Sequence, residues 1–188
     1  MSLLLCFSGQ IGSGKSSVST AVGEALGWRR TGFGDFLRSE ITRLGGNPDS
    51  REALQDLGQK RVDEDPKAFC RDVLTAGGFQ SGENFVIDGV RHVSIFDILV
   101  AVSKPTQARL LFLGAVETTR IARVQTRGDA PDFARATTHR VEAELGDMLP
   151  QRADGVVNAD QPLDRVVSDC LKLTKRWQQS LLSPREDV

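Results

Sequence analysis

The sequence predicts an α/β protein in which a five-stranded parallel sheet carries helices on both faces. Short apolar runs alternate along the chain with longer stretches in which apolar residues recur every three or four positions, a pattern typical of strand–helix–strand units. A glycine-rich loop directly follows the first apolar run, LLLCFS. The length of 188 residues suits one domain with a sizeable core.

Five strands and eight helices are expected in turn along the chain. Strands are expected at 3–8, 85–88, 108–113 and 155–158, with a weaker one at 29–32. Helical patterns occupy 16–26, 35–44, 51–63, 67–76, 95–102, 118–126, 133–148 and 163–182. The mostly helical region at about 35–82 is expected to lie over the carboxyl edge of the sheet, where open α/β sheets bind ligands.

Composition narrows the class of protein. The formal net charge is −1 and the pI is about 6.1, so the broad basic surface of a nucleic-acid-binding protein is not expected. The N-terminal MSLLLCFSG has no basic start and is expected to be a strand rather than a signal peptide, and no apolar run has the roughly 20 residues of a membrane span. Three widely separated cysteines favour buried free thiols in a reducing, cytoplasmic compartment over disulfides or a zinc site.

Residues 9–16, GQIGSGKS, match the phosphate-binding pattern G-x-x-x-x-G-K-S/T at every fixed position, between a predicted strand and a predicted helix. The glycines allow backbone N–H groups to surround phosphate oxygens, and the following helix directs its positive end at the anion. Lys15 is expected to reach the β- and γ-phosphates, and the Ser16 hydroxyl to bind Mg²⁺. The expected ATP-binding residues of this P-loop are Gly9, Gln10, Ile11, Gly12, Ser13, Gly14, Lys15, Ser16 and Ser17.

A second acidic position follows the apolar run Phe-Val-Ile at 85–87. Asp88 is expected to bind Mg²⁺ directly or through water, because a buried strand that ends in Asp delivers a carboxylate to the edge of the sheet. Ser16 and Asp88 are therefore the expected metal ligands.

Three stretches bear on the phosphate acceptor: TGFGDFLR at 31–38, DGVRH at 88–92, and TRIARVQTRGD at 119–129. In the last, spacings of three and four residues place Arg120, Arg123 and Arg127 on one helix face. Transfer between two phosphorylated molecules concentrates negative charge, which planar guanidinium groups bind well.

Taken in order, these motifs resemble the nucleoside-monophosphate-kinase superfamily of P-loop kinases. GDFLR at 34–38 resembles the T-G-D-x-L-R segment of adenylate kinases, and DGVR at 88–91 resembles their D-G-F-P-R with the Phe-Pro pair shortened to one Val. REALQDLGQKR at 51–61 resembles the R-x-x-L-Q-x-x-G-x-x-x-R run of phage-type deoxynucleoside monophosphate kinases. The arginine-rich stretch resembles the lid of the superfamily, and RADGVVN at 152–158 resembles the A-D-x-V-I-x-N segment of dephospho-coenzyme A kinases.

The resemblance implies one P-loop kinase domain over 1–188, with an acceptor-binding insertion at about 35–82 and a short lid at about 125–133. It implies in-line transfer from ATP·Mg²⁺ to a nucleotide or another phosphorylated small molecule, by a monomer or homodimer without a membrane partner. Lys15 and the lid arginines Arg120, Arg123 and Arg127 would neutralise the transferring group. The implied acceptor site comprises Gly34, Asp35, Arg38, Gln55, Arg61 and Arg91.

Alternatives remain at the acceptor. Asp35 is either the catalytic base for a hydroxyl acceptor, or a helix cap and acceptor ligand. A hydroxyl acceptor would mean a dephospho-coenzyme A kinase, or a kinase of a modified nucleotide such as 5-hydroxymethyluracil in phage DNA. DNA would need a local basic groove, for which the chain offers only scattered residues: Arg29, Arg30, Arg38, Arg43, Arg51, Lys60 and Arg61. A GTP switch is disfavoured because Asn158-Ala159-Asp160 lacks the lysine of the guanine-binding Asn-Lys-x-Asp, and a motor ATPase would usually be longer.

Overall fold

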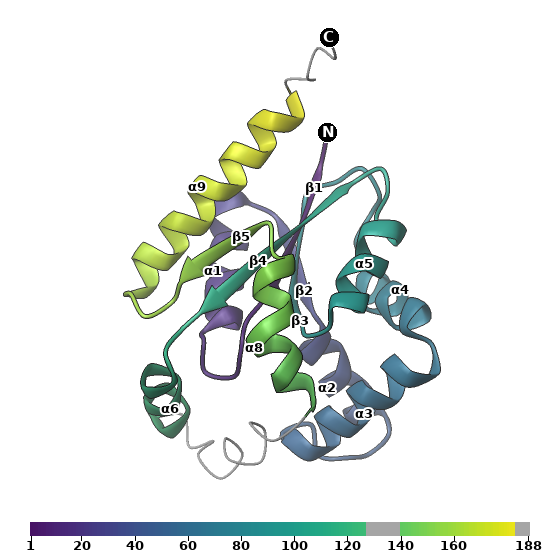
Figure 1. Ribbon diagram of the computed structural model, residues 1–188. Coiled ribbons are helices and arrows are strands. Elements are labelled where there is room, and N and C mark those ends of the chain that lie inside the picture. Colours follow the sequence, from purple (N-terminus) through teal and green to yellow (C-terminus); the bar gives the residue numbers. More distant parts are fainter. Residues whose placement is uncertain (127–139, 183–188) are drawn as a thin grey trace.

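A computed structural model describes residues 1–126 and 140–182 (Figure 1). Its centre is a five-stranded sheet in the order β2-β3-β1-β4-β5, with every neighbouring pair parallel. The strands are β1 (Leu3–Ser8), β2 (Arg29–Gly32), β3 (Phe85–Val90), β4 (Gln107–Gly114) and β5 (Gly155–Asn158). The strand order reverses beside β1 and β3, so a crevice for ligands is expected at the carboxyl ends of these two strands.

Alternation along the strands divides the core between the two faces of the sheet. In β1, Leu4 and Cys6 belong to one buried cluster, whereas Leu5 and Phe7 belong to the other. Every residue of β1 is buried, which is why LLLCFS reads as a continuous apolar run rather than an alternating one.

Helices cover both faces (Figure 1). Helices α1 (Lys15–Leu26) and α9 (Leu163–Leu182) pack on one face, and α4 (Pro66–Ala76), α5 (Val93–Val102) and α8 (Arg140–Arg152) pack on the other. The long helix α9 buries Val166, Cys170, Thr174 and Leu181 at helical spacing, so it contributes one apolar stripe to the core.

Three helices connect β2 to β3, and two of them lie beyond the carboxyl ends of the strands. Helix α2 (Phe33–Arg43) follows β2 directly, and α3 (Arg51–Glu64) and α4 come after it. Ser50 and Asp65 cap α3 and α4 through their side chains, which accept hydrogen bonds from Ala53 N (3.2 Å) and Ala68 N (2.8 Å). No residue of α3 is buried in the core, which leaves one side of this helix open to line a cavity.

The predicted fold class, five-stranded parallel sheet and order of elements are confirmed. Several boundaries differ from the prediction. For example, α2 begins at Phe33 rather than Asp35, β3 continues to Val90 rather than ending at Asp88, and α5 begins at Val93 rather than Ile95. Helix α4 begins at Pro66, where proline suits the first turn of a helix. The helix expected at 133–148 is described only from Arg140, where α8 begins. Most of the expected lid, including Arg127, falls outside the described residues.

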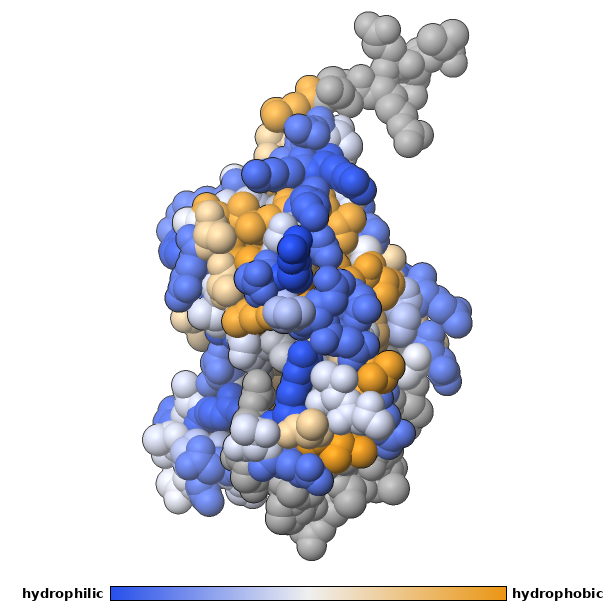
Figure 2. Space-filling model, turned by 90° about the vertical axis from the view of Figure 1, so that its left-hand side faces the viewer, coloured by the Kyte–Doolittle hydropathy of each residue, from blue (hydrophilic) through white to orange (hydrophobic). Residues whose placement is uncertain are grey.

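The surface is mixed rather than broadly apolar on the face seen in Figure 2, where hydrophobic residues form small groups among hydrophilic ones. Among residues 1–126 and 140–182, no helix combines the length and apolar character needed to cross a bilayer.

Candidate functional site

The P-loop connects β1 to α1 at the carboxyl edge of the sheet. Gly9, Gly12 and Gly14 have positive φ, and Gly14 is the N-cap of α1 with φ 84°. The loop closes on itself through Ser13 N, which donates to Gln10 O at 3.1 Å. The first turn of α1 therefore begins at Lys15 and directs its N–H groups at the space where the sequence predicts a phosphate chain.

Helix α6 (Glu117–Thr126) lies against the P-loop. A Cβ on Gly12 would lie only 2.6 Å from Arg120 O and 2.9 Å from Arg120 Cα, so only glycine fits here. Arg120 Nη1 donates to Ile11 O at 3.4 Å, and Arg123 Nη1 donates to Ser13 O at 3.3 Å. Arg123 Nη2 also donates to Ala159 O at 2.8 Å. Arg120 and Arg123 thus share one helix face, as predicted, and that face contacts the P-loop backbone; their expected catalytic role stays a prediction.

Asp88 lies near the end of β3, just before a local irregularity in the pairing of β3 with β1. Its side chain is 6% exposed, and its Oδ2 accepts a hydrogen bond from Arg30 Nη2 at 3.0 Å. Its Oδ1 is buried without a hydrogen-bond partner among the described residues. A buried carboxylate oxygen left without a donor fits a cation or its bound water, and Mg²⁺ commonly uses one or two protein ligands together with phosphate oxygens. The residues present therefore fit the expected magnesium site of Ser16 and Asp88.

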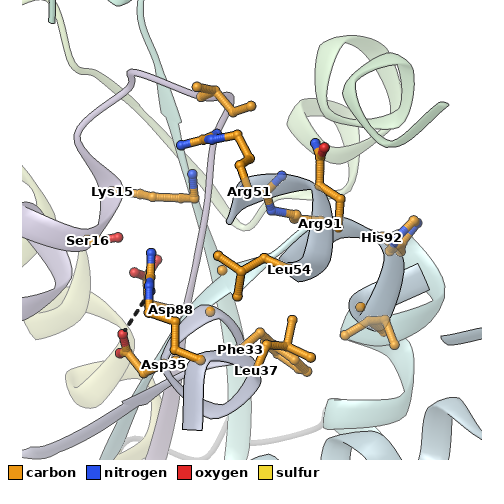
Figure 3. Close-up of a pocket in the computed structure, with 18 of the residues that line it drawn as sticks. Lys15, Ser16, Phe33, Asp35, Leu37, Arg51, Leu54, Asp88, Arg91 and His92 are labelled. Carbon is orange, nitrogen blue, oxygen red and sulfur yellow. Dashed lines mark hydrogen bonds and ion pairs between the residues drawn. The ribbon is translucent and has the colours of Figure 1, made fainter. Parts of the chain in front are cut away.

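One cavity of about 280 Å³ joins the P-loop to the helices between β2 and β3. In Figure 3, Lys15 and Ser16 lie at one end of it and Arg91 and His92 at the other. Three groups of residues line it: Ile11, Gly12, Gly14, Lys15 and Ser16 from the P-loop region; Gly32, Phe33, Gly34, Asp35, Leu37, Arg38, Arg51, Leu54, Gln55, Gly58, Gln59, Val62 and Phe69 from β2 to α4; and Asp88, Gly89, Arg91, His92 and Ile95 from β3 to α5.

Five of the six residues predicted for the acceptor site line this cavity, namely Gly34, Asp35, Arg38, Gln55 and Arg91. Arg61 does not: it pairs with Asp72, and its guanidinium lies over the rings of Phe36 (5.7 Å) and Phe69 (5.4 Å). Arg51, Gln55, Gly58, Gln59 and Val62 form the cavity face of α3, and position 61 lies off that face.

The helix-cap interpretation of Asp35 was wrong. Gly32 is the N-cap of α2, so Asp35 lies inside the first turn. There its carboxylate pairs with Arg30 at 3.1 Å and with Arg38 at 3.5 Å. A carboxylate in the first turn still interacts favourably with the positive end of α2.

Some cavity residues were not predicted as site residues. Arg51 and Gln59 lie four residues to either side of Gln55, a spacing that places all three on one helix face, so this signal was present in the sequence. Arg30 does not line the cavity, but it pairs with Asp35 and Asp88, which do. It was considered only among the scattered basic residues, because Asp88 is 58 residues away along the chain.

A second cavity, of about 300 Å³, lies on the other side of the P-loop. It is lined by Ser13, Gly14, Ser17, Val18, Arg123, Thr126, Ala159, Gln161, Leu163 and Val166. The lining joins α1, α6 and the loop between β5 and α9. It was not predicted from the sequence, because its walls come from three distant segments that carry no common motif.

No protein-family model matches the chain. An adenylate kinase of Synechococcus sp. (strain WH7803) is 26% identical over 142 residues, which cover 73% of this chain and 76% of that protein. A UPF0200 protein of Aeropyrum pernix is 32% identical over 97 residues, about half of either chain (52% and 51%). A crystal structure of a gluconokinase from Sinorhizobium meliloti 1021 superposes with a TM-score of 0.59 and 22% identity, covering 95% of both chains.

Proposed function

We propose that this member of the P-loop, nucleoside-monophosphate-kinase-like superfamily is an ATP-dependent phosphotransferase whose acceptor is a (deoxy)nucleoside monophosphate. Its place in the superfamily rests on the P-loop, the five-stranded parallel sheet and the likeness to an adenylate kinase. The observation that carries the proposal is a single cavity that joins the P-loop residues Lys15 and Ser16 to Arg38, Arg51 and Arg91.

The donor side of the proposal uses the P-loop. Backbone N–H groups of the loop and Lys15 would bind the phosphates of ATP. Ser16 and Asp88 would hold Mg²⁺, which when bound neutralises charge on the β- and γ-phosphates. The second cavity, between Val18, Arg123 and Leu163, suits the base of the donor, because apolar walls and a guanidinium lie beside one another at the end of the P-loop.

The acceptor side combines positive charge with apolar walls. Arg38 comes from α2, Arg51 from α3 and Arg91 from the residues after β3, so three separate elements direct guanidinium groups at one space. Guanidinium groups match phosphate oxygens in geometry and charge. Leu37, Leu54, Val62, Phe69 and Ile95 add an apolar surface on which a flat base could pack. An acceptor that carries both a phosphate and an aromatic ring fits this lining best.

A hydroxyl acceptor is the second candidate, and Asp35 is the residue that favours it. Its carboxylate lines the cavity beside the P-loop and is in place to take the proton of a hydroxyl. The likeness to a gluconokinase supports the same alternative, because a sugar acid offers hydroxyl groups as nucleophiles. This second candidate includes dephospho-coenzyme A and DNA with hydroxymethylated pyrimidines.

The test is ADP formation from ATP and Mg²⁺ with each acceptor in turn. The panel holds the ribo- and deoxynucleoside monophosphates, gluconate, shikimate, dephospho-coenzyme A, and DNA with and without 5-hydroxymethyluracil. We expect strong stimulation by one or a few free monophosphates. Stimulation only by a hydroxyl acceptor would overturn the monophosphate proposal and make Asp35 the expected base.

The Arg91→Gln variant tests whether the acceptor binds in this cavity. We expect it to raise KM for the acceptor by about 10- to 100-fold, the loss that follows from removing one charged hydrogen-bond partner of a phosphate, and to leave KM for ATP unchanged. Arg43→Gln is the matched control, because Arg43 pairs with Glu40 on the exposed side of α2 and does not line the cavity.

A further inference from the structure

We propose that Arg30 is a positioning residue of this site: it holds the carboxylates of Asp35 and Asp88 in place and so directs Asp88 toward the magnesium ion. The inference rests on the proposed function, since it concerns the same metal and the same donor nucleotide. Arg30 lies in the middle of β2, on the edge strand of the sheet, and its side chain is 21% exposed.

One guanidinium group contacts three different elements. Arg30 Nη1 donates to Asp35 Oδ2 in α2 at 3.1 Å, and Arg30 Nη2 donates to Asp88 Oδ2 in β3 at 3.0 Å. Arg30 Nε donates to Ser19 Oγ in α1 at 2.9 Å. The guanidinium is planar and rigid, so three contacts to its three nitrogens fix the relative positions of their partners.

The contact with Ser19 connects Arg30 to the P-loop helix. The Ser19 hydroxyl accepts from Arg30 and donates to Ser16 O at 3.0 Å. Ser19 is fully buried, which makes this connection shielded from water. Arg30 therefore connects the residue expected to hold the metal on α1, Ser16, with the carboxylate expected to hold it on β3, Asp88.

The two carboxylate oxygens of Asp88 have different surroundings. Oδ2 accepts from Arg30, whereas Oδ1 is buried with no hydrogen-bond partner among the described residues. A buried carboxylate needs compensation for the water it loses, and Arg30 supplies it at one oxygen only. The other oxygen is left for the cation, so Arg30 both stabilises the carboxylate and selects which oxygen faces the metal.

The test is the Mg²⁺ dependence of nucleotide binding rather than activity alone. A fluorescent ADP analogue is bound to the protein at a series of MgCl₂ concentrations, and again in EDTA. In the Arg30→Gln variant we expect the Mg²⁺ concentration for half-maximal binding to rise about 10- to 100-fold, the effect typical of removing a group that orients a metal ligand. Binding in EDTA is expected to be unchanged, since Arg30 acts through Asp88.

The neighbouring residue provides a matched control. Arg29 lies on the same strand and pairs with Glu83 at the surface, so Arg29→Gln removes the same charge without touching the site. Arg30→Lys keeps the charge but replaces three nitrogens in a rigid plane with one, and we expect its Mg²⁺ dependence to remain shifted. Ser19→Ala keeps Arg30 and breaks only its connection to α1, which allows the test to proceed if Arg30→Gln does not fold; we expect a smaller shift of the same sign.

The outcomes separate this inference from the proposed function. The inference alone would be overturned if wild-type binding depends on Mg²⁺ and the variants of Arg30 and Ser19 show the same Mg²⁺ dependence. An equal shift in Arg29→Gln would mean a general effect of charge and would also overturn it. Wild-type binding that does not depend on Mg²⁺ would likewise overturn the inference alone. Wild-type protein that does not bind the ADP analogue, with Mg²⁺ or in EDTA, would overturn the proposed function, and the inference with it.

Discussion

Lys15 begins α1 directly after Gly14, and its side chain lines the cavity (Figure 3). Because its ammonium group would neutralise charge that develops on the transferred phosphoryl group, we expect Lys15→Ala to lower kcat by about 10²- to 10³-fold, the loss typical of removing one stabilising donor. Lys60→Ala is the control, since Lys60 lies at the surface of α3 with Glu64 3.8 Å away. Steady-state ADP release measures both variants, and wild-type activity in Lys15→Ala would exclude phosphoryl transfer at the P-loop.

Alanine substitutions at Gly12 and Gly45 distinguish the cost of backbone strain from the cost of a steric clash. Their φ angles are similar, +82° and +77°, but a Cβ on Gly45 would meet nothing within 4 Å, whereas one on Gly12 would meet the backbone of Arg120 at 2.6 Å. We expect Gly45→Ala to lower the free energy of unfolding by about 1–2 kcal/mol, the usual cost of a left-handed alanine. Gly12→Ala should lower it further and should weaken nucleotide binding, because α6 must move. Urea unfolding of the two variants measures the difference, and equal losses would contradict the contact with α6.

Site residues that lie within one short sequence motif could be predicted. Site residues that come together only through the fold could not. The P-loop and Asp88 could be located because each lies at the end of an apolar strand, next to its own motif. Arg30 could not be assigned, because it becomes a neighbour of Asp88 only when β2 pairs with β3. Arg61 was placed in the acceptor site by resemblance, although the helical period directs its side chain toward Asp72 of α4.

Helix α6 connects two distant segments of the chain. Its Arg123 donates hydrogen bonds to Ser13 O in the P-loop and to Ala159 O in the loop after β5. Both contacts border the second cavity, proposed to hold the base of the donor. We expect Arg123→Gln to raise KM for ATP by about tenfold, the equivalent of one lost charged hydrogen bond, with KM for the acceptor unchanged. Arg123→Lys, which keeps the charge but not the two-sided contact, should show most of this loss. A change in the acceptor KM instead would contradict the assignment of the second cavity.

The elements themselves were predictable to the degree that they are buried. Strands β1, β3 and β4 read as apolar runs because both of their faces are covered. Strand β2, RRTG, was the weakest prediction, and only its last two residues are buried. As an edge strand it needs fewer apolar side chains, and its two arginines instead serve an ion pair at the surface and the network around Asp88.

At the scale of the whole molecule, the three cysteines can serve as probes of the core on both faces of the sheet. Cys6 and Cys70 belong to one buried cluster, and Cys170 belongs to the other. All three are free and buried, as the sequence indicated. We expect none of them to react with a thiol reagent in the native protein, and all three to react in urea. Fast labelling of the folded protein would mean that one face of the core opens.

The same thiols should make stability fall at alkaline pH. Burial raises the pKa of Cys70 and of Cys170 to about 12, and burial also raises the pKa of Cys6 well above its ordinary value near 9. Above about pH 9 the unfolded chain therefore binds fewer protons than the native protein, so the free energy of unfolding falls by up to about 1.4 kcal/mol per pH unit for each thiol. Urea unfolding between about pH 7.5 and 9.5 measures this slope below the range in which lysines titrate. Cys170→Ala should reduce the slope, and a slope equal to that of wild type would show that this thiol ionises alike in the folded and unfolded chains.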